Sequence, residues 1–118
     1  MDLEVGFSGS ATYTVTDDMS PAHLPRKVLS TPSMIQLIEA TCLQAIQPLL
    51  GENETTVGVH VCVSHEAAAA SGQEVEVGFE IEEIDRRRLV FRTTVTSGDD
   101  TLSQGTHQRF VVDTSKMG

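Results

Sequence analysis

The stretch STPSMIQLIEATCLQAIQPLL, from Ser30 to Leu50, decides the fold because it predicts the one long helix of the chain. Its apolar residues recur at helical spacing and form one broad stripe. Thr31 suits the N-cap and Pro32 the first helical position, while Pro48 and Gly51 mark the end. A helix of about 19 residues is roughly 28 Å long at 1.5 Å per residue, and a single sheet must cover its apolar stripe.

The rest of the chain predicts that sheet. Alternating apolar and polar residues indicate five strands, at residues 11–17, 55–65, 73–85, 87–97 and 101–113. An irregular connection containing two prolines, residues 18–29, leads into the helix. Gly105 inside the last strand suggests a bulge or a close backbone approach. The expected fold class is therefore α+β, with one antiparallel sheet around one helix, in a single domain of residues 1–118.

Composition excludes several classes of function. The 118 residues are enough for one core. A net charge of −9 argues against a nucleic-acid partner, because phosphate contacts need Lys and Arg. No segment approaches the roughly 20 apolar residues of a membrane helix, and the stretch MDLEVGFSGS begins acidic without an apolar region, so we expect no secretory signal. We expect a cytoplasmic protein with no membrane partner.

The two cysteines, Cys42 and Cys62, lie within the predicted helix and a predicted strand. We expect both to be core residues rather than metal ligands or a disulfide.

One carboxylate interrupts the apolar stripe of the helix. With Met34 at 0° and 100° per residue, Glu39 falls at about 140°, between Ile46 and Leu50. An ionised carboxylate is costly to bury alone, so Glu39 must be paired, shifted in pKa or placed in a wet cleft. Those conditions also describe a catalytic carboxylate. The alternative is that Glu39 reaches solvent at the edge of the stripe or pairs with an Arg.

A partner for this carboxylate follows from the strand at residues 55–65. The valines of residues 57–63 occupy alternate positions, and His65 continues their parity. If the valines face the helix, His65 faces it too. Glu39 and His65 could then form a carboxylate–imidazole unit that orients water or holds a carbonyl. The alternative is that His65 is a satisfied polar residue at the rim of the core.

Four segments resemble the hotdog-fold acyl-CoA thioesterases of the fluoroacetyl-CoA thioesterase type. They are the helical stretch quoted above, TTVGVHVCVSHEAAAASGQEVEV, RRRLVFRTTVTSGDD and GTHQRFVVD, and they span residues 28–113. The resemblance implies a hotdog fold, in which a curved antiparallel β-sheet wraps around one long central helix. It also implies a homodimer, or a dimer of dimers, with the acyl pocket at a subunit interface.

Site residues follow from the same resemblance. It implies that Thr31, Glu39 and His65 are catalytic, that the Gly58 N–H lies near the thioester carbonyl, and that Arg109 lies beside the site. Glu39 would be a general base for water or a nucleophile. Thr31 lies about 12 Å from Glu39 along an ideal helix, so it acts from the helix end, through water or across the dimer interface, or serves only as a cap.

The implied function is hydrolysis of an acyl-CoA, or of a carrier-bound pantetheine thioester, to free acid and thiol. No metal or separate cofactor is expected, because coenzyme A enters as part of the substrate. The alternatives are a hotdog dehydratase or hydratase and a non-catalytic acyl-CoA binding module.

Substrate contacts are suggested by two further features. The basic turn Arg86, Arg87 and Arg88 could hold nucleotide phosphates, and Arg26 and Lys27 precede the helix. Residues 17–30 contain no aromatic residue, whereas fluoroacetyl-specific enzymes of this type carry a Phe-bearing lid there. That difference argues against fluoroacetyl specificity.

Overall fold

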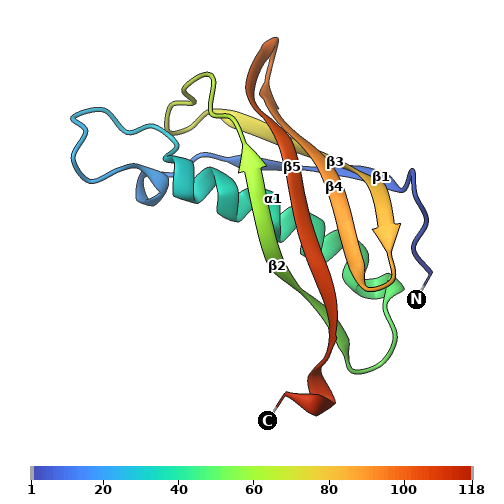
Figure 1. Cartoon of the computed structure of the whole chain (residues 1–118). Helices are drawn as coiled ribbons and strands as arrows, with labels where there is room; N and C mark the ends of the chain where they lie inside the picture. Colours follow the sequence, from blue (N-terminus) through green and yellow to red (C-terminus); the bar gives the residue numbers. More distant parts are fainter. Residues whose placement is uncertain (1, 118) are drawn as a thin grey trace.

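The computed structural model describes residues 2–117, which form one helix against one five-stranded sheet. The helix is α1 (Thr31–Ile46). The strands are β1 (Ser8–Thr14), β2 (Glu54–Val63), β3 (Glu74–Asp85), β4 (Arg88–Ser97) and β5 (Asp100–Asp113). All pairs are antiparallel, in the order β1-β3-β4-β5-β2, and α1 lies along one face of the sheet (Figure 1). The predicted architecture of one helix and one antiparallel sheet is confirmed.

The start of α1 differs from the prediction by one residue. Ser30 is the N-cap, and its Oγ accepts a hydrogen bond from the Ser33 N–H at 3.2 Å. Thr31 is the first helical residue, so its hydroxyl is not used for capping. At the other end, Pro48 lies in a short 3₁₀ turn, Gln47–Leu49. The helix is therefore 16 residues long, shorter than predicted.

Two apolar clusters hold α1 on the sheet. Near its start, Met34 and Ile38 pack with residues of the central strands and of the two connections, namely Val15, Leu29, Ala69, Val75, Val77, Val95 and Leu102. Near its end, Cys42 and Ile46 pack with the aromatic half of the sheet, namely Phe79, Ile81, Leu89, Phe91 and Val111. Burial of each large side chain contributes roughly 1.5–3 kcal/mol, so α1 has a defined height and rotation over the strands.

The predicted alternation of β2 is only half right. The β2–β5 register shifts between Gly58 and His60, which inserts a bulge into the strand. Before the bulge, Thr56 is buried while Val57 is 38% exposed, and Val59, within the bulge, is 54% exposed. After it the parity reverses, so that Val63 packs against the core. The sequence predicted one uninterrupted valine face, because strict period-two alternation does not reveal a bulge.

Close packing between β2 and β5 explains a glycine. A Cβ at Gly105 would overlap the Cys62 carbonyl oxygen and lie 2.7 Å from the Val63 Cα. The predicted close backbone approach is confirmed. Cys42 is buried as predicted, but Cys62 is exposed on the edge strand, which corrects its assignment to the core. Within residues 2–117, no helix is both long enough and apolar enough to span a membrane.

Candidate active site

The first polar pair of the site joins the start of α1 to the residues after β2. Thr31 Oγ1 and His65 Nδ1 lie 2.7 Å apart, both at the surface. The pair forms because the connection before α1 is fastened to the segment after His65: the Leu29 N–H donates to the Ala69 carbonyl at 2.8 Å. A free Thr31 hydroxyl therefore meets an imidazole that comes from 34 residues further along the chain.

This pair borders a pocket of about 370 Å³. The pocket is walled on one side by the connection before α1 and on the other by the segment after β2, and its lining includes Leu24, Val28, Thr31, His65, Glu66 and Ala67. Such a volume lies at the lower end of the range for small-molecule sites. Its walls are mainly aliphatic, with a hydroxyl and an imidazole at the border. That composition suits a short acyl group or a pantetheine arm.

The second polar group of the site is centred on Arg109, which projects from β5 toward α1. Arg109 Nε donates to Thr56 Oγ1 at 2.7 Å, and Nη2 donates to the Thr56 carbonyl at 3.0 Å. The remaining nitrogen, Nη1, lies 3.5 Å from Glu39 Oε2. The Arg109 side chain is 6% exposed and that of Glu39 is 40% exposed. A buried, fixed cation thus holds a carboxylate that can still be reached by water.

His107 completes this group. Its Nδ1 lies 2.8 Å from the His60 carbonyl, which can only accept, so Nδ1 carries the proton. Its Nε2 then accepts from Arg109 Nη1 at 3.1 Å. Burial lowers the pKa of His107, and the neighbouring Arg109 charge acts in the same direction. A neutral His107 therefore fixes the nitrogen of Arg109 that faces Glu39.

Gly58 lies above these three side chains. A Cβ at this position would lie 2.5 Å from Glu39 Oε2, 3.3 Å from His107 Cε1 and 3.4 Å from Arg109 Nη1. Any side chain here would displace the carboxylate. Gly58 itself is exposed, so its backbone is accessible to solvent beside Glu39.

Other reactive groups are absent from the described site. Burial raises the pKa of the Cys42 thiol to about 12, so the nucleophilic thiolate is suppressed at neutral pH. Among residues 2–117, no three His, Cys, Asp or Glu side chains are grouped as a metal site requires. Among the side chains described above, Thr31, Glu39, His65 and Arg109 are therefore the candidates for polar chemistry on a substrate.

Comparison with known proteins gives the family. The sequence model described as FlK, fluoroacetyl-CoA-specific thioesterase, matches residues 10–115. The chain belongs to this family. The fluoroacetyl-CoA thioesterase of Streptantibioticus cattleyicolor is 36% identical over 91 residues, which span 77% of this chain and 66% of that relative. The FlK family membership predicted from the sequence is confirmed.

Solved structures agree with the FlK assignment. A structure of the fluoroacetyl-CoA thioesterase FlK superposes with a TM-score of 0.93 at 29% identity and covers 99% of this chain and 93% of that one. A mutant of that enzyme in complex with fluoroacetate and CoA superposes with a TM-score of 0.92, also at 29% identity. A Thermus thermophilus thioesterase superfamily member, 23% identical with a TM-score of 0.90, covers 99% of this chain and 90% of that one and supports the fold. The predicted hotdog fold is confirmed.

Within one chain of this FlK-family protein, the three residues predicted to be catalytic form two separate groups. His65 meets Thr31, whereas Glu39 meets Arg109. Within residues 2–117, no hydrogen bond or ion pair joins Glu39 to His65. The expected carboxylate–imidazole unit is therefore not formed inside one chain. Of the alternatives left open for Glu39, pairing with an Arg is what the structure shows.

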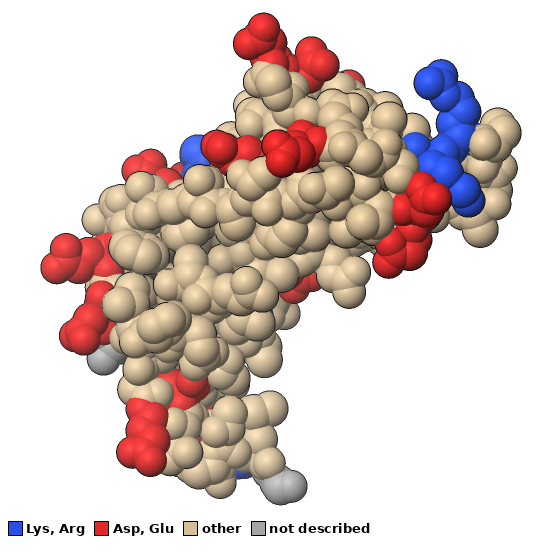
Figure 2. Space-filling view, turned by 180° about the vertical axis from the view of Figure 1, so that it is seen from behind, with Lys and Arg blue, Asp and Glu red and all other residues tan. Residues whose placement is uncertain are grey.

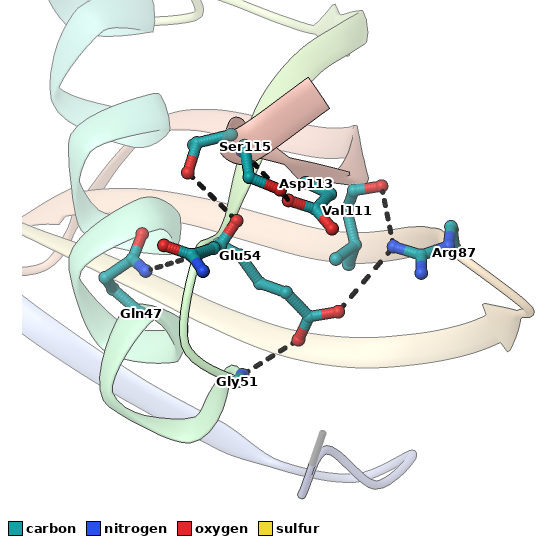
Figure 3. Close-up of polar contacts among 9 residues, drawn as sticks. Gln47, Gly51, Glu54, Arg87, Val111, Asp113 and Ser115 are labelled. Carbon is teal, nitrogen blue, oxygen red and sulfur yellow. Dashed lines mark hydrogen bonds and ion pairs between the residues drawn. The ribbon is translucent and has the colours of Figure 1, made fainter. Parts of the chain in front are cut away.

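The basic turn predicted to contact phosphates lies at the far end of α1. Arg87 contacts Glu54 at 3.6 Å and the Val111 carbonyl at 3.5 Å (Figure 3). Arg88 pairs with Glu83 and with Asp85. Arg86 is exposed at the turn itself, with a φ of 59°. Two of the three guanidinium groups are thus already paired with carboxylates, and the turn is remote from Thr31 and His65.

Sequence reasoning missed His107 and the capping role of Ser30. The signal for His107 was present, because residues two apart in a strand share a face and Arg109 was already a candidate. The signal for Ser30 was weaker, since Ser and Thr are both good N-caps and stand next to each other.

Neutral His107 makes the stability of the protein dependent on pH. The folded state lowers its pKa below the ordinary value of about 6.5, so the unfolded chain binds the proton more readily. The stability that neutral His107 contributes is therefore complete above about pH 6.5, and it is lost as the pH falls toward the lowered pKa of the folded state. The groups that face His107 are Arg109, Glu39 and His60.

We expect the free energy of unfolding in urea to fall less between pH 7 and pH 5 in His107→Asn than in the wild type. The exposed His23→Asn should behave as the wild type, and an equal loss in all three proteins would contradict the expectation.

Proposed function

We propose that the protein hydrolyses an acyl-CoA thioester to free acid and coenzyme A. The observation that carries the proposal is the Thr31–His65 pair at 2.7 Å on the border of an aliphatic pocket, in a member of a thioesterase family. A hydroxyl bonded to an imidazole can orient a thioester carbonyl or a water molecule, and the imidazole can supply a proton to a leaving thiolate. The substrate is activated by its own coenzyme A, so the proposed chemistry uses no further cofactor.

Two copies of the chain would complete this site. Thr31 and Glu39 are eight residues apart on one straight helix, about 12 Å along its axis, which is too far for one thioester carbon to contact both. The edge strand β2 carries exposed Val57 and Val59 beside Gly58, with exposed Phe110 opposite Val57 on β5. An apolar, unpaired edge of this kind is normally covered. We propose a homodimer in which Glu39 of one chain faces Thr31 and His65 of its partner.

The roles of the groups follow from their charges. The Gly58 N–H would polarise the thioester carbonyl and stabilise the developing oxyanion. Glu39, paired with Arg109, would either remove a proton from attacking water or attack the carbonyl carbon itself. In both routes the C–S bond breaks, and the thiolate takes a proton from His65. The second route passes through an acyl–Glu39 anhydride, which water then hydrolyses to the acid and the carboxylate.

The proposed acyl group is short and aliphatic. Residues 17–30, which wall the pocket, contain no Phe, Tyr or Trp. The FlK relatives act on fluoroacetyl-CoA by name, and the absence of an aromatic here argues for another small acyl group. A panel from acetyl-CoA to octanoyl-CoA, with fluoroacetyl-CoA included, tests this by thiol release and product analysis. Loss or addition of water without thiol release would indicate a dehydratase or hydratase, and binding without turnover a sensing module.

Substitutions at the helix start separate capping from catalysis. Thr31→Val keeps the branched shape but removes the hydroxyl that contacts His65. We expect kcat/KM to fall at least about tenfold, with the free energy of unfolding within about 0.5 kcal/mol of wild type. Ser30→Ala removes the cap and should cost about 1 kcal/mol of stability while turnover is retained. Wild-type turnover in Thr31→Val would remove Thr31 from the proposed mechanism.

A further inference from the structure

We propose that Arg26 and Lys27 bind the phosphate groups of the coenzyme A portion of the substrate, an inference that rests on the proposed thioesterase function. Both residues are exposed and lie in the connection that walls the pocket beside Thr31 and His65. Nothing in the sequence distinguishes them from the basic turn at residues 86–88. The structure does, because Arg87 and Arg88 of that turn are paired with carboxylates and the turn is distant from the pocket.

Half of the cations of this acidic protein are already neutralised. Four of its eight Lys and Arg side chains pair with carboxylates, namely Arg87, Arg88, Arg92 and Arg109. Within residues 2–117, the side chains of Arg26 and Lys27 make no ion pair or hydrogen bond. An anion approaching a protein of net charge −9 needs a local positive field, and adjacent unpaired cations provide one.

Acidic groups near this doublet are engaged by neutral donors. Asp17 accepts from Ser71 Oγ at 2.5 Å. Glu66 accepts from Ser64 Oγ at 2.6 Å and from Gln104 Nε2 at 3.0 Å, and these hydrogen bonds lower its pKa. Figure 2 shows the main group of blue side chains at one end of the molecule, over the connection that precedes α1, with red side chains beside it. The carboxylates of this end are thus stabilised without using Arg26 or Lys27.

The backbone under the doublet is held in place. The Lys27 carbonyl accepts from the Ser71 N–H at 3.0 Å, and the Val28 N–H donates to Ser20 Oγ at 3.2 Å. Val28 also forms a β-bridge with Ala70. The two cations therefore start from a fixed position at the rim of the pocket, although their side chains extend into solvent.

The distance from the reacting groups suits coenzyme A. Thr31 is the fifth residue after Arg26, at most about 17 Å away along an extended chain. A pantetheine arm has a comparable length, and it would run along the rim of the pocket, past the exposed Leu24, with its thioester at Thr31 and His65 and its acyl group inside the pocket. The Arg86 turn lies beyond the opposite end of α1, a helix about 24 Å long. The doublet is the basic group next to the pocket.

The test compares substrates with and without phosphates. For the acyl group that the panel identifies, KM is measured with the acyl-CoA and with the matching acyl-pantetheine, which lacks all the phosphates. In Arg26→Glu/Lys27→Glu we expect the KM for acyl-CoA to rise at least about tenfold while that for acyl-pantetheine stays within about twofold. Arg92→Glu/Lys116→Glu carries the same change in net charge elsewhere on the surface and should leave both KM values near wild type.

Direct binding makes the result independent of turnover. Adenosine 3′,5′-bisphosphate, the nucleotide end of coenzyme A, should bind the wild type and lose affinity in the Arg26/Lys27 double variant. Unchanged KM and unchanged nucleotide binding in that variant overturn the inference. A larger effect of Arg86→Glu also overturns it, in favour of the distant turn. Nucleotide binding that depends on the doublet, with no hydrolysis of either thioester, would preserve this inference and overturn the proposed function.

Discussion

Glu39→Gln is expected to lower kcat/KM for the best acyl-CoA at least about a hundredfold, whether Glu39 acts as base or nucleophile. The substitution keeps the shape of the side chain and removes only its charge. Because the Glu39 side chain is 40% exposed, the fold should survive, with a circular dichroism spectrum like that of the wild type. Arg109 then loses its counter-charge, so some loss of stability will accompany the loss of turnover.

A matched control is available on the outer face of the sheet. Glu76 is exposed on β3, and Glu76→Gln makes the same change in net charge away from α1. Its turnover should equal that of the wild type. Thiol release by Glu39→Gln within about threefold of the control would remove Glu39 from the mechanism.

The two routes open to Glu39 leave different isotopic traces. In a single turnover in H₂¹⁸O, a general base sends the label only into the released acid. A nucleophile forms an anhydride, and attack of water on its Glu39 carbonyl would leave ¹⁸O in the protein. Label found by mass spectrometry in the peptide that contains Glu39 therefore identifies the nucleophilic route, and an acyl adduct on the same peptide identifies it when water attacks the acyl carbonyl instead.

Arg109→Met is expected to produce the largest loss of stability. The guanidinium is buried and contacts Thr56, Glu39 and His107, so its removal leaves the Thr56 carbonyl and His107 Nε2 without a donor. Removal of one partner of a buried, hydrogen-bonded charge group costs roughly 3–5 kcal/mol. In a domain of this size that lowers Tm by roughly 10 °C or more. Turnover of the remaining folded protein should also fall, since Glu39 is no longer held.

Unfolding in urea, at one fixed protein concentration, checks this prediction. The comparison is Arg92→Met, which breaks the exposed Arg92–Glu82 pair and should cost under about 1 kcal/mol. Arg109→Lys should lie near Arg109→Met, because a single ammonium cannot replace a planar group that binds in three directions. A loss for Arg109→Met no greater than that of Arg92→Met would show that the buried group is not what holds β5 to α1.

Much of the fold could be predicted from the sequence because its two periodicities differ so clearly. The stripe from Met34 to Ile46 has helical spacing, and β3 places apolar side chains at every second position from Val75 to Ile81. These patterns depend on neighbours a few residues apart. The predicted N-cap, Thr31, was wrong by one residue. Ser30 and Thr31 both carry a hydroxyl that can cap a helix, so only the backbone geometry decides between them.

By itself, the sequence determined the helix, the strands, the FlK-family resemblance and the presence of a carboxylate inside the apolar stripe. Only the tertiary structure decided which side chains meet. Thr31 contacts His65 and Glu39 contacts Arg109 because the bulge at Gly58 and the β2–β5 register determine which residues of these strands lie beside each turn of α1. A bulge changes strand parity after it, and a register is fixed by packing across the whole sheet, so neither is encoded in local alternation.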